Sequence, residues 1–98
     1  MHNLKMVSLS ITCINKSDRT SPHERISRIG GRLPDGSSWK ILTSTAIHNI
    51  ENNIQGYYVS IGGQRAEVVV ATHLGNKYLK TTRDTTTVDN LLSLPECP

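Results

Sequence analysis

The chain has 98 residues, of which 36% are apolar, and a formal charge of +3 at pH 7 with histidine neutral. This length allows one domain with a thin core and excludes a large multidomain enzyme, because such a chain buries only about 60–65% of its unfolded surface. The sequence pI of about 9.1 is mildly basic, as is often the case for domains that bind nucleic acid. A surplus of positive charge this small can equally serve only to keep the protein soluble.

The first predicted element is a strand from Val7 to Ile14. In "MVSLSITCIN" the apolar residues Val7, Leu9, Ile11 and Cys13 alternate with polar ones, whereas a secretion signal needs a continuous apolar run. No stretch approaches the roughly 18 apolar residues of a membrane span. We therefore expect a cytoplasmic protein without membrane contact, in which both cysteines are reduced thiols.

Residues 22–29 allow two interpretations. Ser21-Pro22-His23-Glu24 has the spacing of a helix capping box, with proline at the first helical position. Alternatively, "RISRIGGR" is a strand that pairs with "SSWKIL" across the turn "LPDG". We favour one helical turn over residues 22–25, followed by this hairpin.

A short helix is predicted next, capped by Thr43 or Ser44 and ended by Asn52, Asn53 and Gly56. One side of it carries an apolar stripe, which consists of Ala46, Ile47, Ile50 and Ile54. A helix of about ten residues is not stable alone, so this stripe must rest on a sheet.

The remaining pattern predicts a meander of three strands. "YYVSI" and "RAEVVVAT" flank Gly62-Gly63, which suits a hairpin turn because glycine accepts positive φ. The consecutive residues Val68, Val69 and Val70 place apolar groups on both faces, which indicates a central strand. "HLGNK" then turns the chain into "YLKTT".

These elements predict a single small α+β domain. The order is three strands, one helix and three strands, forming a twisted antiparallel sheet of about five or six strands with the helix packed on one face. We expect residues 1–10 to hold a variable extension and the start of the first strand, and residues 11–98 to form the domain, including the C-terminal tail.

The tail carries three leucines, Leu91, Leu92 and Leu94. Burial of one leucine contributes about 1.5–3 kcal/mol, so three of them seldom stay in water. We expect "NLLSLPEC" to fold back and close the core. The alternative is a short peptide motif held out for a partner protein.

Several phrases along the chain occur together in one known family: "ITCINK", "PHERISRIGG", "VVVA", "GNKYLKT" and "NLLSLPEC". From Ile11 to Cys97 the chain resembles a family of small bacterial and phage-borne proteins, domain of unknown function 3892. The resemblance implies one intact small domain that includes the tail, and it implies no activity.

The sequence gives little evidence for a catalytic site or a metal site. The one candidate metal set is Cys13, His23 and Cys97, and it is weak because it lacks the close ligand pairs typical of zinc sites. A Cys13–Cys97 disulfide requires the tail to dock beside the first strand, and a reducing cytosol disfavours it. No pair of carboxylates has convincing spacing, so we expect no enzyme and no cofactor.

Basic residues form two groups, which would merge into one surface only if the first hairpin and the last strand share a sheet face. The candidate nucleic-acid-binding residues are Arg25, Arg28, Arg32, Lys77, Lys80 and Arg83. Tyr58 or Tyr78 would then offer a stacking platform for bases, whereas Trp39 is expected to be a core anchor.

We therefore expect a small binding module that meets a protein partner or a second copy of itself through an exposed sheet face or edge. Weak nucleic-acid binding through the basic sheet surface is the alternative.

Overall fold

The structure is a computed structural model that describes residues 8–17, 25–82 and 89–98. Its strands are β1 (Ser8–Ser10), β2 (Cys13–Lys16), β3 (Ile26–Arg32), β4 (Ser38–Leu42), β5 (Gly56–Ile61), β6 (Gln64–His73) and β7 (Asn76–Thr81). Its helices are α1 (Thr43–Glu51) and α2 (Asp89–Leu92). The α+β class and the order of strands, helix and strands are confirmed. Neither described helix is long and apolar enough to cross a membrane.

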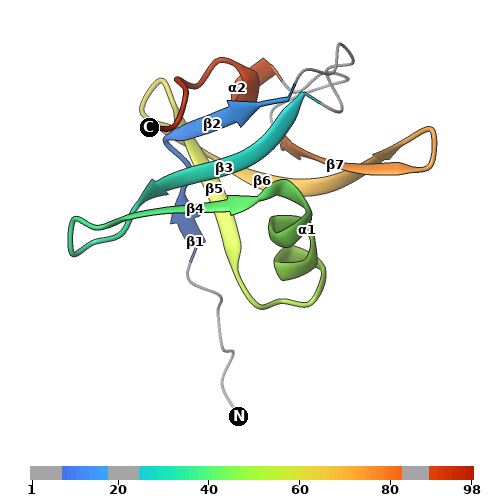
Figure 1. The fold of residues 1–98 in the computed structure, drawn as a ribbon, viewed down its shortest axis with the longest axis horizontal. Coiled ribbons are helices and arrows are strands. Elements are labelled where there is room, and N and C mark those ends of the chain that lie inside the picture. Colours follow the sequence, from blue (N-terminus) through green and yellow to red (C-terminus); the bar gives the residue numbers. More distant parts are fainter. Residues whose placement is uncertain (1–7, 18–24, 83–88) are drawn as a thin grey trace.

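The strands form two sheets, where the sequence predicts one. The four-stranded sheet has the order β1-β5-β6-β7, and the three-stranded sheet has the order β2-β3-β4. All pairs of these strands are antiparallel except β1 with β5, which is parallel. Figure 1 shows β3 and β4 running across β5, so the strands of the two sheets cross.

The predicted strand from Val7 to Ile14 is divided between the two sheets, as β1 and β2. The backbone N–H of Ile11 donates to Tyr58 O at 2.8 Å, and the next N–H, of Thr12, donates to Gly30 O at 2.9 Å. The hydrogen-bonding partner therefore changes sheet within one residue. Ile11 and Ile14 are both buried although they are three residues apart, so the buried positions shift from odd to even where the chain changes sheets, while the apolar alternation in the sequence continues to Cys13.

The core is aliphatic and lies between the two sheets, with α1 and the tail closing its ends. Ile14 and Ile29 come from the three-stranded sheet, and Tyr57, Val59, Val68 and Leu79 come from the four-stranded sheet. Ile11, between β1 and β2, Ala46 of α1 and Leu91 of α2 complete it. Trp39 packs at its edge, with its ring centroid 5.6 Å from that of Tyr57, as expected for a core anchor.

The hairpin of β3 and β4 is confirmed, and the strand interpretation holds for residues 26–29. The helical turn that we favoured covers residues 22–25, of which 22–24 lie outside the described residues. Arg25 is described, and it precedes β3 without being helical. In the turn, Asp35 Oδ1 accepts hydrogen bonds from the hydroxyl and the backbone N–H of Ser37, and both bonds lower the pKa of Asp35.

Helix α1 differs from its prediction at both ends. Thr43 is its first residue, and the Thr43 hydroxyl donates to Ile26 O at 3.0 Å instead of capping the helix. At the other end the helix stops at Glu51, so Ile54 lies beyond the apolar stripe and is 59% exposed. Ala46, Ile47 and Ile50 do pack on the core.

The meander of β5, β6 and β7 forms as predicted, with β6 in the middle. Gly62 and Gly63 turn the first hairpin with φ of 55° and 81°. The second hairpin turns through Leu74 and Gly75, with φ of 51° and 82°. Leu74 is therefore a leucine in the left-handed region, and its side chain is 88% exposed.

Candidate functional site

The outward face of the three-stranded sheet carries three basic residues. Along β3 the buried Ile29 points to the core, so its neighbours Arg28 and Gly30, and then Arg32, face outward. Across the hairpin, Lys40 pairs with Gly30. Arg28, Arg32 and Lys40 are all exposed, and they surround Gly30 on one face.

The tail lies beside β2 and crosses onto this face. Ile14 and Glu96 form a parallel bridge, in which Ile14 N donates to Pro95 O and Cys97 N donates to Ile14 O, both at 2.9 Å. The side-chain amide of Asn15 also donates to Cys97 O at 3.3 Å. These bonds continue the sheet by one short parallel segment next to β2.

A disulfide joins Cys13 to Cys97, with an S–S distance of 2.09 Å and Cα atoms 4.9 Å apart. The prediction of two reduced thiols is therefore wrong for this structure. The physical reason is the tail: because it docks beside β2, it brings together two cysteines that are 84 positions apart. A β-carbon on Gly30 would lie 2.9 Å from Cys97 Sγ and 3.0 Å from Cys13 Sγ, so only glycine leaves room for the bond.

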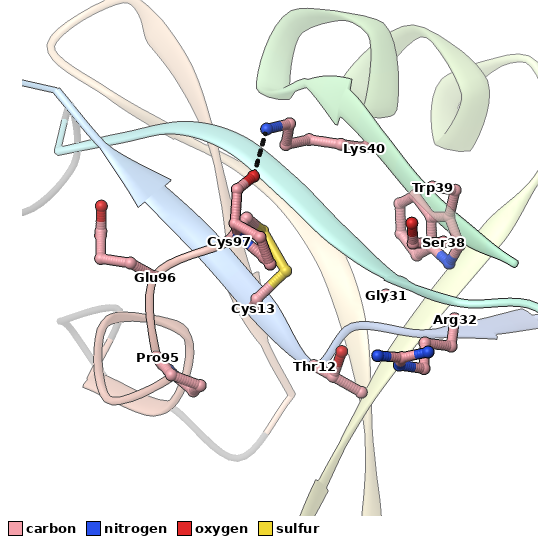
Figure 2. Close-up of a pocket in the computed structure, with 11 residues that line it drawn as sticks. Thr12, Cys13, Gly31, Arg32, Ser38, Trp39, Lys40, Pro95, Glu96 and Cys97 are labelled. Atoms are coloured by element: carbon pink, nitrogen blue, oxygen red, sulfur yellow. Dashed lines mark hydrogen bonds between the residues drawn. A yellow bond between two sulfur atoms is a disulfide. The ribbon is translucent and has the colours of Figure 1, made fainter. Parts of the chain in front are cut away.

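A groove of about 380 Å³ lies between the tail and the hairpin. Its lining comes from four segments: Thr12 and Cys13, Gly31 and Arg32, Ser38 to Lys40, and Pro95 to Pro98. Figure 2 shows the disulfide between the tail and β2, with Lys40 reaching over it toward the end of the tail. This volume lies in the range of small-ligand sites, about 300–1,000 Å³.

The charges of the groove are predominantly positive. Lys40 Nζ donates to Pro98 O at 3.0 Å, and Arg32 Nη1 donates to Gly36 O at 3.3 Å, so both cations are held by main-chain oxygens. Among the described residues, neither of them nor Arg28 forms an ion pair with an Asp or Glu side chain. The acidic residue in the lining is Glu96, and its side chain lies on the side of the tail away from the disulfide (Figure 2).

The indole of Trp39 leaves one polar atom without a partner. In the described part of the chain, Trp39 Nε1 is the buried side-chain nitrogen or oxygen that makes no hydrogen bond. Trp39 also lines the groove. An unpaired buried N–H is unfavourable by about 1–3 kcal/mol, so a hydrogen-bond acceptor that reached it would gain from the contact.

The six basic residues predicted for nucleic-acid binding are not all brought together. Arg28 and Arg32 share the outward face of β3. Lys77 lies on β7 of the other sheet and pairs with Glu51 of α1 at 2.8 Å. Lys80, three residues further along β7, falls on the opposite face of that strand by alternation. Arg25 is half-buried before β3, and Arg83 lies outside the described residues.

The tyrosines proposed as stacking platforms are covered. The guanidinium of Arg65 lies 4.1 Å from the ring centroid of Tyr58, and a hydrogen bond to Glu67 raises the pKa of Arg65. Tyr78 is only 9% exposed. Stacking of bases on either ring would need these contacts to change.

The two cysteines of the candidate metal set are not available as metal ligands. Cys13 and Cys97 are consumed in the disulfide, and a disulfide provides no thiolate for a metal. His23 lies outside the described residues. Among the residues that are described, no group of three or more His, Cys, Asp or Glu is placed to hold a metal ion.

The tail leucines pack inward. Leu91 is 0% exposed, and Leu92 and Leu94 are half-buried against the core. The tail therefore closes the domain and also forms one wall of the groove.

Sequence reasoning did not identify Lys40 or Glu96 as parts of a site. A signal for Lys40 was present, because pairing "RISRIGGR" with "SSWKIL" across "LPDG" puts Lys40 beside Gly30. The position of Glu96 depends on tail docking, which no local pattern encodes.

A family model matches residues 10–95, and its description is protein of unknown function (DUF3892). The chain belongs to this family. The family assignment inferred from the sequence is thereby confirmed, and the matched region of this DUF3892 member includes β2 to β7, both described helices and the tail leucines, together with the last residue of β1. No curated protein and no solved structure matches the chain.

Proposed function

We propose that this DUF3892 protein is a cytoplasmic interaction module without catalytic activity. Its working surface is the groove between the tail and the β3–β4 hairpin, and its occupant is an acidic segment of a partner protein. The observation that carries this proposal is the set of three basic residues on one exposed face, Arg28, Arg32 and Lys40, which have no Asp or Glu side chain as a partner among the described residues.

Charge complementarity selects the kind of partner. A carboxylate in the groove would meet Arg32 and Lys40, whose hydrogen bonds now go to the main-chain oxygens of Gly36 and Pro98. Arginine binds carboxylates through two parallel N–H groups, and such bonds are stronger than bonds between neutral groups. The volume of about 380 Å³ accommodates a few side chains, which suits a short segment rather than a whole domain.

The edge of β4 supports an extended conformation for that segment. This strand is the outer strand of its sheet, so one side of its backbone is not paired with any of the described strands. An added strand would gain main-chain hydrogen bonds there while its acidic side chains reach Lys40 and Arg32.

Nucleic acid is the less favoured occupant. Proteins that bind single strands combine a positive groove with exposed aromatic rings on which the bases stack. Here Tyr57 is buried, and Arg65 covers Tyr58. A phosphate chain would find cations in the groove, but the aromatic ring that lines it, Trp39, is half-buried and packs against Tyr57.

The protein's single tryptophan makes the test direct, because Trp39 lines the groove and reports on its occupation. The oxidised full chain is titrated at low salt with a capped, cysteine-free peptide of alternating Glu and Ala. We expect a saturable change in Trp39 fluorescence and no change with the matching Gln–Ala peptide. Replacing Arg32 or Lys40 with Ala should weaken binding by about fivefold, which corresponds to about 1 kcal/mol.

The matched control is Lys80→Ala, which removes a lysine from the other sheet and should leave the affinity unchanged. No response to the acidic peptide would refute the proposal. Tighter binding of a single-stranded oligonucleotide, with an affinity that falls steeply with salt, would replace it with the nucleic-acid alternative. Association of the protein with itself in sedimentation, blocked by Lys40→Ala, would make a second copy the occupant.

A further inference from the structure

The disulfide is itself part of the groove surface. Cys13 and Cys97 both line the groove, and both residues are partly exposed. Their sulfur atoms lie over Gly30, on the outward face of β3. One side of the bond is therefore covered by the sheet while the other faces the groove, which differs from a structural disulfide sealed in a core.

One cation stands near this bond, and a second lines the same groove. Lys40 Nζ is held at 3.0 Å from the main-chain oxygen of Pro98, the residue that follows Cys97. Arg32 lies two residues from Gly30 along β3, and its guanidinium donates to Gly36 O in the hairpin turn. Positive charge near a disulfide stabilises both the attacking thiolate and the thiolate that leaves, and it raises the local concentration of anions.

The tail has other attachments that survive cleavage of the bond. Leu91 is fully buried, and the backbone bonds of Ile14 with Pro95 and Cys97 do not involve sulfur. Cleavage would thus free the two sulfur atoms while the core contact of the tail remains. This arrangement allows the bond to open and close without unfolding of the domain.

We propose that Cys13–Cys97 is an exchangeable disulfide that reacts with anionic low-molecular-weight thiols, of the class of carboxylate-bearing thiol peptides. The thiolate of the small molecule attacks Cys97 Sγ. A new S–S bond forms between them, the Cys13–Cys97 bond breaks, and Cys13 leaves as a thiolate. A second thiolate then attacks the small molecule's own sulfur in the mixed disulfide, which releases the symmetrical small-molecule disulfide and Cys97 as a thiolate.

Cys97 is the site of attack because it lies on the terminal segment beside Lys40, whereas Cys13 lies on β2 between β3 and the tail. In a reducing compartment such a bond senses the ratio of thiol to disulfide, which is the common use of cytosolic disulfides. When the bond is open, the tail wall of the groove is held only by its backbone hydrogen bonds and by its core contact through Leu91. The chemistry rests on the groove and its charges, and it does not require the acidic partner.

The experiment compares three thiols on the oxidised full chain: glutathione, which is anionic, 2-mercaptoethanol, which is neutral, and cysteamine, which is cationic. Reaction is stopped by acid, the products are counted by mass spectrometry, and each rate is divided by the thiolate concentration. We expect glutathione to react about tenfold faster than cysteamine at low salt, and the difference to shrink at high salt. Peptide mapping should locate the first mixed disulfide on Cys97.

Lys40→Gln should reduce the advantage of the anionic thiol severalfold, while Lys80→Gln, on the other sheet, should preserve it. Rates without charge dependence, reaction only after denaturation, or a mixed disulfide on Cys13 would each overturn the proposal. The outcome is separable from the proposed function, because peptide binding is measured on oxidised protein with a probe that contains no thiol.

Discussion

Trp39 and Gly31 face each other across the β3–β4 hairpin, and the indole occupies the space where a side chain on residue 31 would stand. A β-carbon on Gly31 would lie 3.0 Å from Trp39 Nε1 and would overlap the backbone oxygen of Ser10. Ser10 ends β1, so the two sheets are in close contact at this glycine. This contact fixes the indole at one side of the groove.

Gly31→Ala is therefore expected to lower the free energy of unfolding by about 1–3 kcal/mol, the usual effect of overpacking. The overlapping atom is a backbone oxygen and cannot rotate away. The measurement is urea denaturation followed by Trp39 fluorescence. Ser38→Ala, at an exposed position of the same hairpin, is the control and should change little. An alanine variant as stable as the wild type would mean that β1 does not lie against β3 at this point.

Removal of the disulfide tests how the tail is held. The bond closes a loop of 84 positions, and loss of such a cross-link is expected to lower the free energy of unfolding by about 2–5 kcal/mol. The double variant Cys13→Ser, Cys97→Ser is compared with the wild type in urea, with and without a dithiol reductant. Reductant should bring the wild type to the level of the variant and leave the variant unaffected. If the oxidised wild type is no more stable than the variant, the bond does not constrain the unfolded chain.

Local patterns predicted the hairpins because the residues that specify them are adjacent. Gly62 and Gly63 adopt positive φ, and the valine run of β6 lies in the centre of its sheet. The division between β1 and β2 was not predictable in this way, since the apolar alternation in the sequence runs on to Cys13, whereas the buried positions shift from Ile11 to Ile14 where the chain changes sheets. Ile54 shows the converse: it continues the helical stripe in the sequence, yet the chain has already left the helix.

The site was less predictable than the fold because its parts come from both ends of the chain. The disulfide and the groove exist only if the tail docks beside β2, and that docking depends on Leu91 reaching the core. Tail packing was predicted from the leucines. We expected reduced thiols because we expected a cytoplasmic protein, and not because of any geometric argument. The docked tail permits the Cys13–Cys97 disulfide that this expectation left out.

Leu91→Ala tests the same packing directly. Leu91 is 0% exposed, so truncation leaves a cavity, and we expect a loss of about 2–5 kcal/mol in the free energy of unfolding. Denaturation in urea measures it, under oxidising conditions that keep the tail covalently attached. Leu74→Ala is the matched control, because Leu74 is 88% exposed and its truncation creates no cavity. Equal effects of the two substitutions would contradict an interior position for Leu91.

The turn between β6 and β7 offers a stabilising substitution. Leu74 has a φ of 51° and precedes Gly75, whose φ is 82°, so both central residues of the turn are left-handed. Leucine is strained there by about 1–2 kcal/mol, whereas Asn-Gly is the preferred pair for such a turn. Because the leucine side chain is 88% exposed, its removal loses little burial.

Leu74→Asn is therefore expected to raise the free energy of unfolding by about 0.5–1 kcal/mol, less than the full strain because asparagine also has some preference for right-handed backbone. Thermal and urea denaturation should agree on the sign. Leu74→Val is the control and should destabilise, since a β-branched side chain fits positive φ worst. If asparagine and valine have the same effect, strain in the backbone does not determine stability at this turn.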